Sequence, residues 1–325
     1  METELNGRLL VLAGGSGFLG QALAKHFHAL GWHVVVLTRS PQANRATREV
    51  RWDAETLGAW TAELEGVAVV INLTGRTVDC RYTAENRRLI MDSRVKSTRV
   101  LGQAIAKCAE PPRMWLNASS ATIYRHTFAQ AWDETGTDFA ATPEVKDGFS
   151  LEVIQAWERT LNEAVTPRTR KVAARTTMVL GLARNSVFPV LRRLARLGLG
   201  GRMGSGDQFV SWLHETDFLR AVEFLIEHEE LSGTVNFAAP NPVPNHELMR
   251  AFRQLVGMPI GLPASAWMLE VGAFFLRTET ELILKSRRVV PGRLVKAGFK
   301  FRFPELRGAL AELQAREIQR RLVKP

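Results

Sequence analysis

Three glycines spaced three residues apart, Gly14, Gly17 and Gly20, separate an apolar run from an amphipathic stretch. The run Leu9–Ala13 has no polar side chain, which is typical of a strand buried on both faces of a parallel sheet. After the glycines, apolar residues recur at helical spacing until Gly31. A strand, a glycine-rich turn and a helix in this order predict a βαβ unit, and so constrain the chain to an α/β fold.

Strands and helices continue to alternate as far as about residue 180. This alternation predicts a doubly wound parallel sheet. The expected strands cover residues 34–37, 67–73, 114–118 and 171–176, and the expected helices cover residues 83–108 and 151–165.

Beyond residue 180 the pattern changes. The sequence predicts a basic helix over 188–197, a glycine-dense loop over 198–206, a strand over 209–214, a helix over 217–227, a strand over 234–237 that returns to the sheet, and Pro-interrupted helices from 240 to the end. We therefore expect a nucleotide-binding domain of residues 7–180 plus 209–239. The second unit is a smaller, mostly helical, substrate-side lobe of residues 181–208 plus 240–325. The glycine-dense loop is either a lid or wall for a substrate, or a plain connection.

The composition of the chain argues against several classes of protein, among them metal-binding, disulfide-rich, membrane-spanning and nucleic-acid-binding proteins. The 325 residues carry 43 Lys and Arg against 33 Asp and Glu, and 13 of the basic residues fall within 277–325. Cys80 and Cys108 lack partners at zinc-ligand spacing, so neither a metal site nor a disulfide framework is expected. With no leader pattern and no membrane-length apolar run, a cytoplasmic protein that binds no membrane is predicted. The tail around Arg316, Arg320, Arg321 and Lys324 is read as a solvated amphipathic helix; contact with nucleic acid or an acidic membrane is the less favoured alternative.

The glycine turn predicts a dinucleotide site. The first glycine makes the turn, the second lets the backbone approach a pyrophosphate, and the third lets helix and strand pack closely. The phosphates would face the N–H groups at the start of the helix. The expected contacts are Gly14, Ser16, Gly17, Phe18, Leu19 and Gly20.

The end of the second strand indicates which coenzyme binds. At this offset an acidic residue would accept from the ribose 2′-hydroxyl of NAD, whereas an arginine accommodates the 2′-phosphate of NADP. The sequence has Arg39 followed by Ser40, and no acid. NADP(H) is therefore the predicted coenzyme.

Several segments resemble those of a known family. These are Gly14–Gly20, Asn72–Gly75, Ser119-Ser120-x-x-x-Tyr124, Trp157-Glu158, Arg175–Gly181, 198–208, 211–217, 240–245, 286–291 and 298–301. Together they resemble the extended short-chain dehydrogenase/reductases (SDR), which have a Rossmann fold. More narrowly, they resemble the "epimerase family protein" branch of nucleoside-diphosphate-sugar-epimerase-like proteins, with its C-terminal domain of unknown function. The resemblance implies further coenzyme contacts from Asn72, Leu73, Thr74, Gly75, Arg94 and Met178. A strand-end turn is the alternative role for Asn72 and Gly75.

The chain lacks the catalytic pair that is usual in this superfamily. Reductases of this superfamily use Tyr-x-x-x-Lys, but alignment through Glu158 places Ser150 and Ile154 at these positions, and the pair occurs nowhere in the chain. Ser119, Ser120 and Tyr124 are candidates for the missing hydroxyl donor, with turn formation or packing as their alternative role. His214 is expected to have a structural role, with Thr216 or Asp217 as the N-cap of the following helix.

The leading hypothesis is an NADP(H)-binding oxidoreductase or epimerase-like enzyme that acts on a small polar substrate, with sugar-related compounds among the expected classes. The alternative is an NADP(H)-binding sensor or regulatory protein without turnover. The sequence leaves the substrate and the oligomeric state open.

Overall fold

A seven-stranded parallel sheet forms the centre of the computed structural model, which describes residues 8–42, 47–270 and 279–323. Lys324 of the basic tail lies outside the described residues. The strand order is β10-β6-β5-β4-β1-β2-β3. The strands are β1 (Leu9–Ala13), β2 (His33–Thr38), β3 (Arg48–Arg51), β4 (Val69–Asn72), β5 (Met114–Ser120), β6 (Arg170–Thr176) and β10 (Gly233–Phe237).

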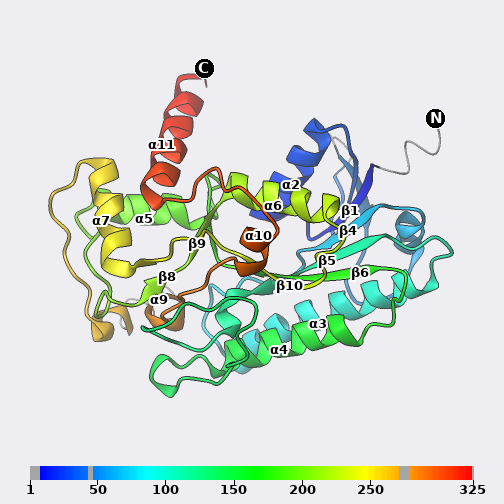
Figure 1. The fold of residues 1–325 in the computed structure, drawn as a ribbon, viewed down its shortest axis with the longest axis horizontal. Coiled ribbons are helices and arrows are strands. Elements are labelled where there is room, and N and C mark those ends of the chain that lie inside the picture. The colour runs from blue at the N-terminus through cyan, green and yellow to red at the C-terminus, as the bar shows by residue number, and fades with distance from the viewer. Residues whose placement is uncertain (1–7, 43–46, 271–278, 324–325) are drawn as a thin grey trace.

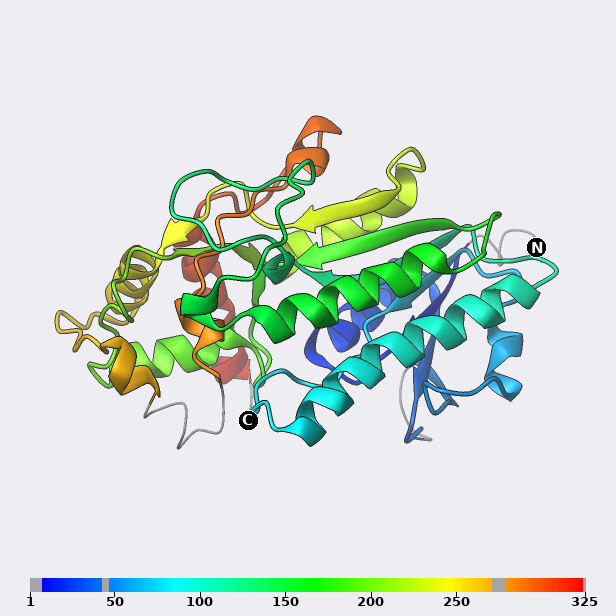
Figure 2. The ribbon, with the colours of Figure 1, turned by 90° about the horizontal axis from the view of Figure 1, so that it is seen from below.

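Helices cover both faces of this sheet (Figures 1 and 2). On one face lie α2 (Phe18–Ala29) and α6 (Glu215–Glu227), and on the other lie α3 (Ala84–Lys107) and α4 (Gly148–Glu163). Alternate residues of β1 serve the two layers: Leu10 and Leu12 pack with Phe27 of α2, whereas Val11 packs with Leu101 of α3. The predicted doubly wound fold is therefore confirmed.

A second hydrophobic core lies outside the main sheet. It joins Trp212 to Phe188 and Phe252 of two helices and to Leu310 of the C-terminal helix. The other described strands and helices from β7 to the C-terminus are β7 (Met178–Leu180), α5 (Val187–Arg196), β8 (Phe209–Val210), β9 (Trp212–His214), β11 (Val243–Pro244), α7 (Asn245–Val256), α9 (Glu281–Leu284), α10 (Gly292–Lys296) and α11 (Leu306–Val323). Leu294 and Phe299 pack instead on the core of the main sheet, so the C-terminal part of the chain contacts both cores.

The structure corrects three sequence-based expectations. Strand β3 was not predicted, because its residues Arg-Glu-Val-Arg are mostly polar at the edge of the sheet. The strand expected over 209–214 is split, since β8 pairs with β11 and β9 pairs with β7. Helix α6 begins at Glu215 and its N-cap is His214, whose ring accepts from the N–H of Thr216; neither Thr216 nor Asp217 is the cap.

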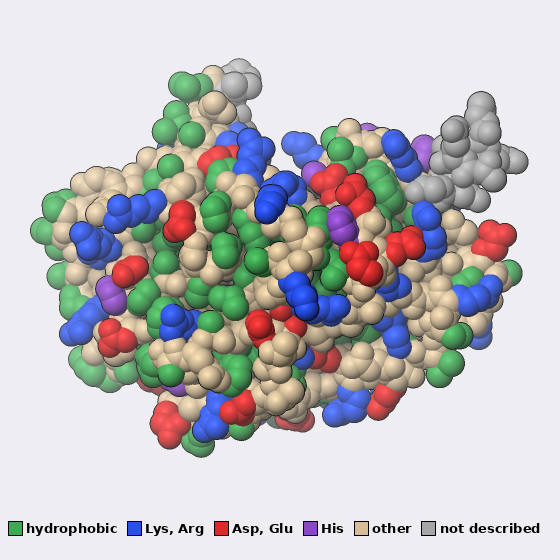
Figure 3. Space-filling model, in the orientation of Figure 1, with side chains coloured by type: hydrophobic (Ala, Val, Ile, Leu, Met, Phe, Trp, Pro, Cys, Tyr) green, Lys and Arg blue, Asp and Glu red, His purple; other side chains and the backbone are tan. Residues whose placement is uncertain are grey.

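Surface charge is mixed on the face shown in Figure 3, where basic and acidic side chains are interspersed. On α11, Arg316 pairs with Glu215 and Glu312, and Arg321 pairs with Glu317. No helix among the described residues has the length and apolar character needed to cross a membrane.

Candidate functional site

The glycine turn that follows β1 lies against the chain that follows β4. Gly14 has φ of 79°, and a Cβ there would lie 2.8 Å from the backbone of Leu73 and Thr74. A Cβ on Gly20 would lie 2.7 Å from the Gly14 carbonyl oxygen, so helix α2 sits directly against the turn. No side chain caps the start of α2 at Gly17, and Ser16 and Gly17 are exposed. The positive end of the helix is therefore presented at the carboxyl edge of the sheet, where anions bind.

The turn after β4 is fixed by Asn72. Its buried amide donates to Thr98 and Asn117, and its Oδ1 accepts from the N–H of Thr74 at 3.0 Å. The Thr74 hydroxyl oxygen is buried and has no hydrogen-bond partner among the described residues. Asn72 thus fixes the turn at the end of the strand, which is the alternative role considered for it. The Thr74 hydroxyl, beside the glycine turn, stays without a partner among the described residues. Such an atom fits a bound coenzyme.

Two arginines line a pocket at the ends of β2 and β3, where the sequence predicts the adenosine of the coenzyme. The predicted Arg39 follows β2, and Arg51 ends β3 in register with Thr38. Both are exposed and both line a pocket of about 430 Å³ that also includes Trp52 and Asp53. Hydrogen bonds from the hydroxyl and the backbone N–H of Thr56 lower the pKa of Asp53 to about 2. The Asp53 carboxylate is therefore charged at neutral pH, and Thr56 already donates to it. Ser40 is exposed next to Arg39.

Arg51 was not among the predicted site residues, because the sequence did not predict the strand β3 that holds it. A phosphate-sized anion near Arg39 would gain a second guanidinium only through the parallel pairing of β2 and β3.

Arg94 lies beside the turn after β4. A Cβ on Gly75 would be 3.2 Å from its guanidinium carbon. The guanidinium donates to the carbonyl oxygens of Arg76 and Ile90 and lies over the ring of Trp157, and burial lowers its pKa to about 10. The structure therefore brings Arg94 together with the Asn72–Gly75 turn.

Met178 begins β7 and packs, partly buried, against the second hydrophobic core around Trp212. Three residues later, a Cβ on Gly181 would overlap the ring of Phe18. The segment that follows β6 thus reaches the start of α2, although the Met178 side chain itself packs against the second hydrophobic core.

The three catalytic candidates have local partners. The Ser119 hydroxyl donates to Glu158, which binds the guanidinium of Arg175 at 2.7 and 2.8 Å. The buried Tyr124 hydroxyl donates to Asn236 at 3.0 Å and accepts from Arg175 at 2.9 Å. Ser120 accepts from the N–H of Thr122 and caps a short 3-10 helix, η2 (Ala121–Ile123). These hydroxyl groups thus serve a buried network and a turn.

His214 also has a structural environment. Its Nδ1 accepts from Thr216 and its Nε2 lies 2.9 Å from Glu312. Burial lowers its pKa to about 3, so the ring is neutral near pH 7. No group of three or more His, Cys, Asp or Glu that could hold a metal ion occurs in the described ranges.

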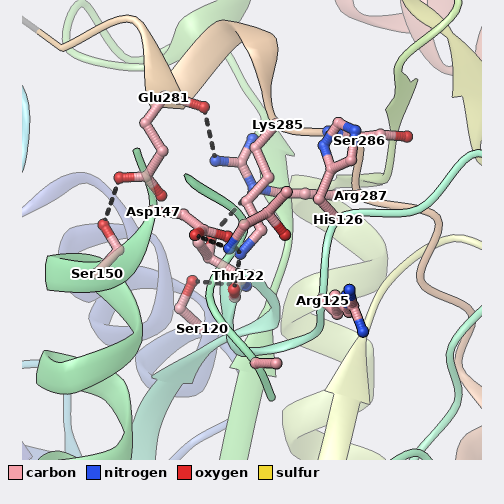
Figure 4. A network of polar contacts seen from close by, with 12 residues as sticks. Ser120, Thr122, Arg125, His126, Asp147, Ser150, Glu281, Lys285, Ser286 and Arg287 are labelled. Atoms are coloured by element: carbon pink, nitrogen blue, oxygen red, sulfur yellow. Dashed lines mark hydrogen bonds and ion pairs between the residues drawn. The ribbon is translucent and has the colours of Figure 1, made fainter. Parts of the chain in front are cut away.

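A polar network that the sequence did not reveal joins α9 to the start of α4 (Figure 4). Ser150 donates to the carboxylate of Glu281 at 2.6 Å. Lys285 lies 2.7 Å from the Asp147 carboxylate and donates to the carbonyl oxygen of Thr122 at 2.7 Å. The Arg287 guanidinium donates to the Thr122 hydroxyl at 3.1 Å.

Burial raises the pKa of Glu281 and lowers the pKa of Lys285. The segment 286–291 resembled the family, but nothing in the sequence placed Glu281 or Lys285 next to a helix about 130 residues earlier.

Comparison with known proteins gives the same architecture. Residues 10–238 match the model of the NAD dependent epimerase/dehydratase family, and residues 264–313 match a domain of unknown function, DUF1731. The bovine "Epimerase family protein SDR39U1" is 31% identical over 94% of this chain and 99% of its own. A crystal structure of the human SDR39U1 (isoform 2), described as "with NADPH", covers 94% of this chain and 99% of its own with a TM-score of 0.82 and 27% identity. A Corynebacterium glutamicum structure named nucleoside-diphosphate sugar epimerase is 24% identical over 98% of this chain and 62% of its own, with a TM-score of 0.74, and shows the fold alone.

Proposed function

Because the chain belongs to the NAD dependent epimerase/dehydratase family and carries the C-terminal domain found at 264–313, we propose that it is an NADP(H)-binding oxidoreductase or epimerase-like enzyme. Its substrate would be a small polar molecule, with sugar-related compounds as the expected class. The observation that favours NADP(H) over NAD(H) is that Arg39 and Arg51 line the same pocket. The human relative described with NADPH supports the same choice.

Each part of the site has a defined task in this proposal. The Gly14 turn and the start of α2 would hold the pyrophosphate. Arg39, Arg51 and Ser40 would bind the 2′-phosphate, and Thr74 would offer its unused hydroxyl to the coenzyme. When bound, the coenzyme would supply or accept a hydride. The protein would position the substrate and handle the proton.

Coenzyme selectivity tests this proposal by calorimetry with NADPH and NADH. We expect the wild type to prefer NADPH, and Arg39→Ala or Arg51→Ala to weaken NADPH binding roughly tenfold or more, because each removes a charge-assisted hydrogen bond. NADH affinity should change little. Arg48→Ala is the matched control, since Arg48 lies on the same strand but pairs with Glu63. Equal affinity of the wild type for both coenzymes would remove the arginine assignment, and failure to bind either would remove the whole proposal.

A sensor without turnover is the second candidate. It is favoured by the lack of a Tyr-x-x-x-Lys pair and by the commitment of Ser119 and Tyr124 to the buried network around Arg175. A panel of aldehydes, ketones and sugar nucleotides, followed by NADPH absorbance, separates the two. Consumption of NADPH favours the enzyme, whereas partner capture that depends on NADPH without its consumption favours the sensor.

A further inference from the structure

Two buried polar atoms without hydrogen-bond partners among the described residues belong to neighbouring side chains at the start of α4. The first is Oε1 of Glu281, whose side chain is 3% exposed, and the second is the hydroxyl oxygen of Tyr82. Neither has a hydrogen bond of good geometry with another described residue. Ser150 and Glu281 both influence the pKa of Tyr82, which burial raises to about 12, so the three groups share one site. Buried polar atoms without partners are rare, and these are of the kind that a hydroxyl or carbonyl group of a ligand would satisfy.

A series of neighbouring groups links this site to the carboxyl edge of the sheet. A Cβ on Gly14 would lie 2.8 Å from the backbone of Leu73 and Thr74, and a Cβ on Gly75 would lie 3.2 Å from the guanidinium carbon of Arg94. Tyr82 is near enough to Arg94 to act on its pKa. In doubly wound sheets, ligands bind outside the carboxyl ends of the strands. Ser150 is also the residue that alignment places where reductases have their tyrosine.

The other charged groups of the network are already matched. Lys285 is fully buried and is paired with Asp147, which also accepts from the backbone of Thr142. Arg287 is bonded to the Thr122 hydroxyl and lies close to the carbonyl oxygen of Glu281. Glu281 differs from them because one carboxylate oxygen accepts from Ser150 and the other is unused. In Figure 4, its side chain descends from α9 to Ser150 on the first turn of α4.

We propose that Glu281, acting through the hydroxyl of Ser150, is the proton donor and acceptor of this chain for a carbonyl or hydroxyl group of the substrate. Tyr82 would hold the same oxygen by a hydrogen bond. The inference rests on the proposed function, because it requires this group to lie beside the nicotinamide of the bound coenzyme. It makes the C-terminal domain part of the catalytic site.

The proton balance is simple. In the reducing direction the carbonyl carbon gains a hydride from the coenzyme, and the C=O double bond becomes a single bond. The carbonyl oxygen takes the hydroxyl proton of Ser150, which takes the carboxyl proton of Glu281, so that the product is an alcohol and Glu281 is left as a carboxylate. Solvent then restores the proton. Oxidation of an alcohol runs through the same transfers in reverse.

The protonation of Glu281 depends on what faces it. Burial raises its pKa, and the negative charge of Asp147 acts in the same direction. Arg287, Lys285 and the hydrogen bond from Ser150 act against this shift. Since Ser150 stabilises the charged form, its removal must raise the pKa further.

The affinity for the coenzyme alone depends on the charge of Glu281, so this charge can be followed without any substrate. The nicotinamide ring is positive in NADP⁺ and neutral in NADPH, so an ionised Glu281 nearby favours NADP⁺. We expect the ratio of NADPH to NADP⁺ dissociation constants, measured by calorimetry across a pH series, to rise with pH by roughly tenfold in the wild type. In Glu281→Gln the ratio should stay constant. Glu134→Gln is the matched control, because Glu134 is another carboxyl whose pKa is raised by burial but it binds the backbone of Asn236 and Arg293.

A second variant covers the case in which Glu281→Gln does not fold. Ser150→Ala should keep the rise but move its midpoint to higher pH. For any carbonyl compound that the wild type reduces, Glu281→Gln should lower kcat by roughly a hundredfold or more with little change in KM. A ratio that does not vary with pH in the wild type, or that varies equally in Glu281→Gln, would overturn the assignment of Glu281 alone. Lack of binding of both coenzymes to the wild type would instead reject the proposed function.

Discussion

The ammonium group of Lys285 lies 2.7 Å from the carboxylate of Asp147, and neither side chain is exposed to solvent. Lys285 comes from the C-terminal domain and Asp147 immediately precedes α4 of the main domain. The pair thus fixes α9 against the main domain, together with the bond from Lys285 to Thr122.

Lys285→Met should therefore destabilise the protein strongly. It leaves the Asp147 carboxylate buried without its counter-charge, and we expect the free energy of unfolding in urea to fall by about 3–5 kcal/mol. Lys146→Met is the control, because the neighbouring Lys146 is exposed and its pair with Glu270 lies at the surface. Its loss should be below about 1 kcal/mol. Equal small losses in both variants would show that the buried pair contributes little.

Gly20→Ala should disturb the nucleotide turn. The added Cβ would meet backbone atoms of Gly15 and Gly14 at 2.6 and 2.7 Å, so α2 must move away from the turn. We expect a loss of about 1–3 kcal/mol in urea unfolding and weaker NADPH binding by calorimetry. Gly308→Ala in α11 meets nothing within 4 Å and should instead stabilise by about 0.4–1 kcal/mol. Unchanged NADPH binding in Gly20→Ala would contradict the role given to this turn.

Tyr124→Phe separates a structural role from a catalytic one. The ring and its stacking on Trp132 are retained, but Asn236 and Arg175 each lose a hydrogen-bond partner. We expect a loss of about 1–3 kcal/mol in thermal or urea unfolding, with NADPH binding and the turnover of any reduced carbonyl unchanged. The opposite pattern, normal stability with turnover abolished, would make Tyr124 the catalytic hydroxyl.

Acid should destabilise the protein through His214. Burial lowers the pKa of this ring in the folded state to about 3, below its ordinary value of about 6.5, so at intermediate pH the unfolded state binds more protons. Stability then falls as pH decreases through this window, by up to about 1.4 kcal/mol per pH unit. The raised pKa of Glu312 opposes this slope.

The measurement is the urea unfolding of wild type and His214→Gln at a series of pH values. The glutamine keeps hydrogen-bonding atoms without the titration, so the difference between the two proteins should shrink as pH falls. A difference that is independent of pH would show that the ring does not titrate on unfolding.

Much of the main sheet was predictable because its signals are local. The apolar runs of β1, β2 and β4 and the periodic helices each reside in a few consecutive residues. The edge strand β3 was not predicted. Its residues are mostly polar, and its pairing with β2 rather than its composition makes it a strand. The split of 209–214 into β8 and β9 was likewise decided by two different partner strands.

The site divides in the same way. The glycine turn, the arginine after β2 and the lack of a Tyr-x-x-x-Lys pair could all be predicted from the order of residues, because backbone conformation and residue type suffice for each. Only the tertiary structure placed Arg51 beside Arg39 and Glu281 beside Ser150. These pairs join residues that are distant in the chain, and burial gives Glu281 its raised pKa only after the C-terminal domain has packed on α4.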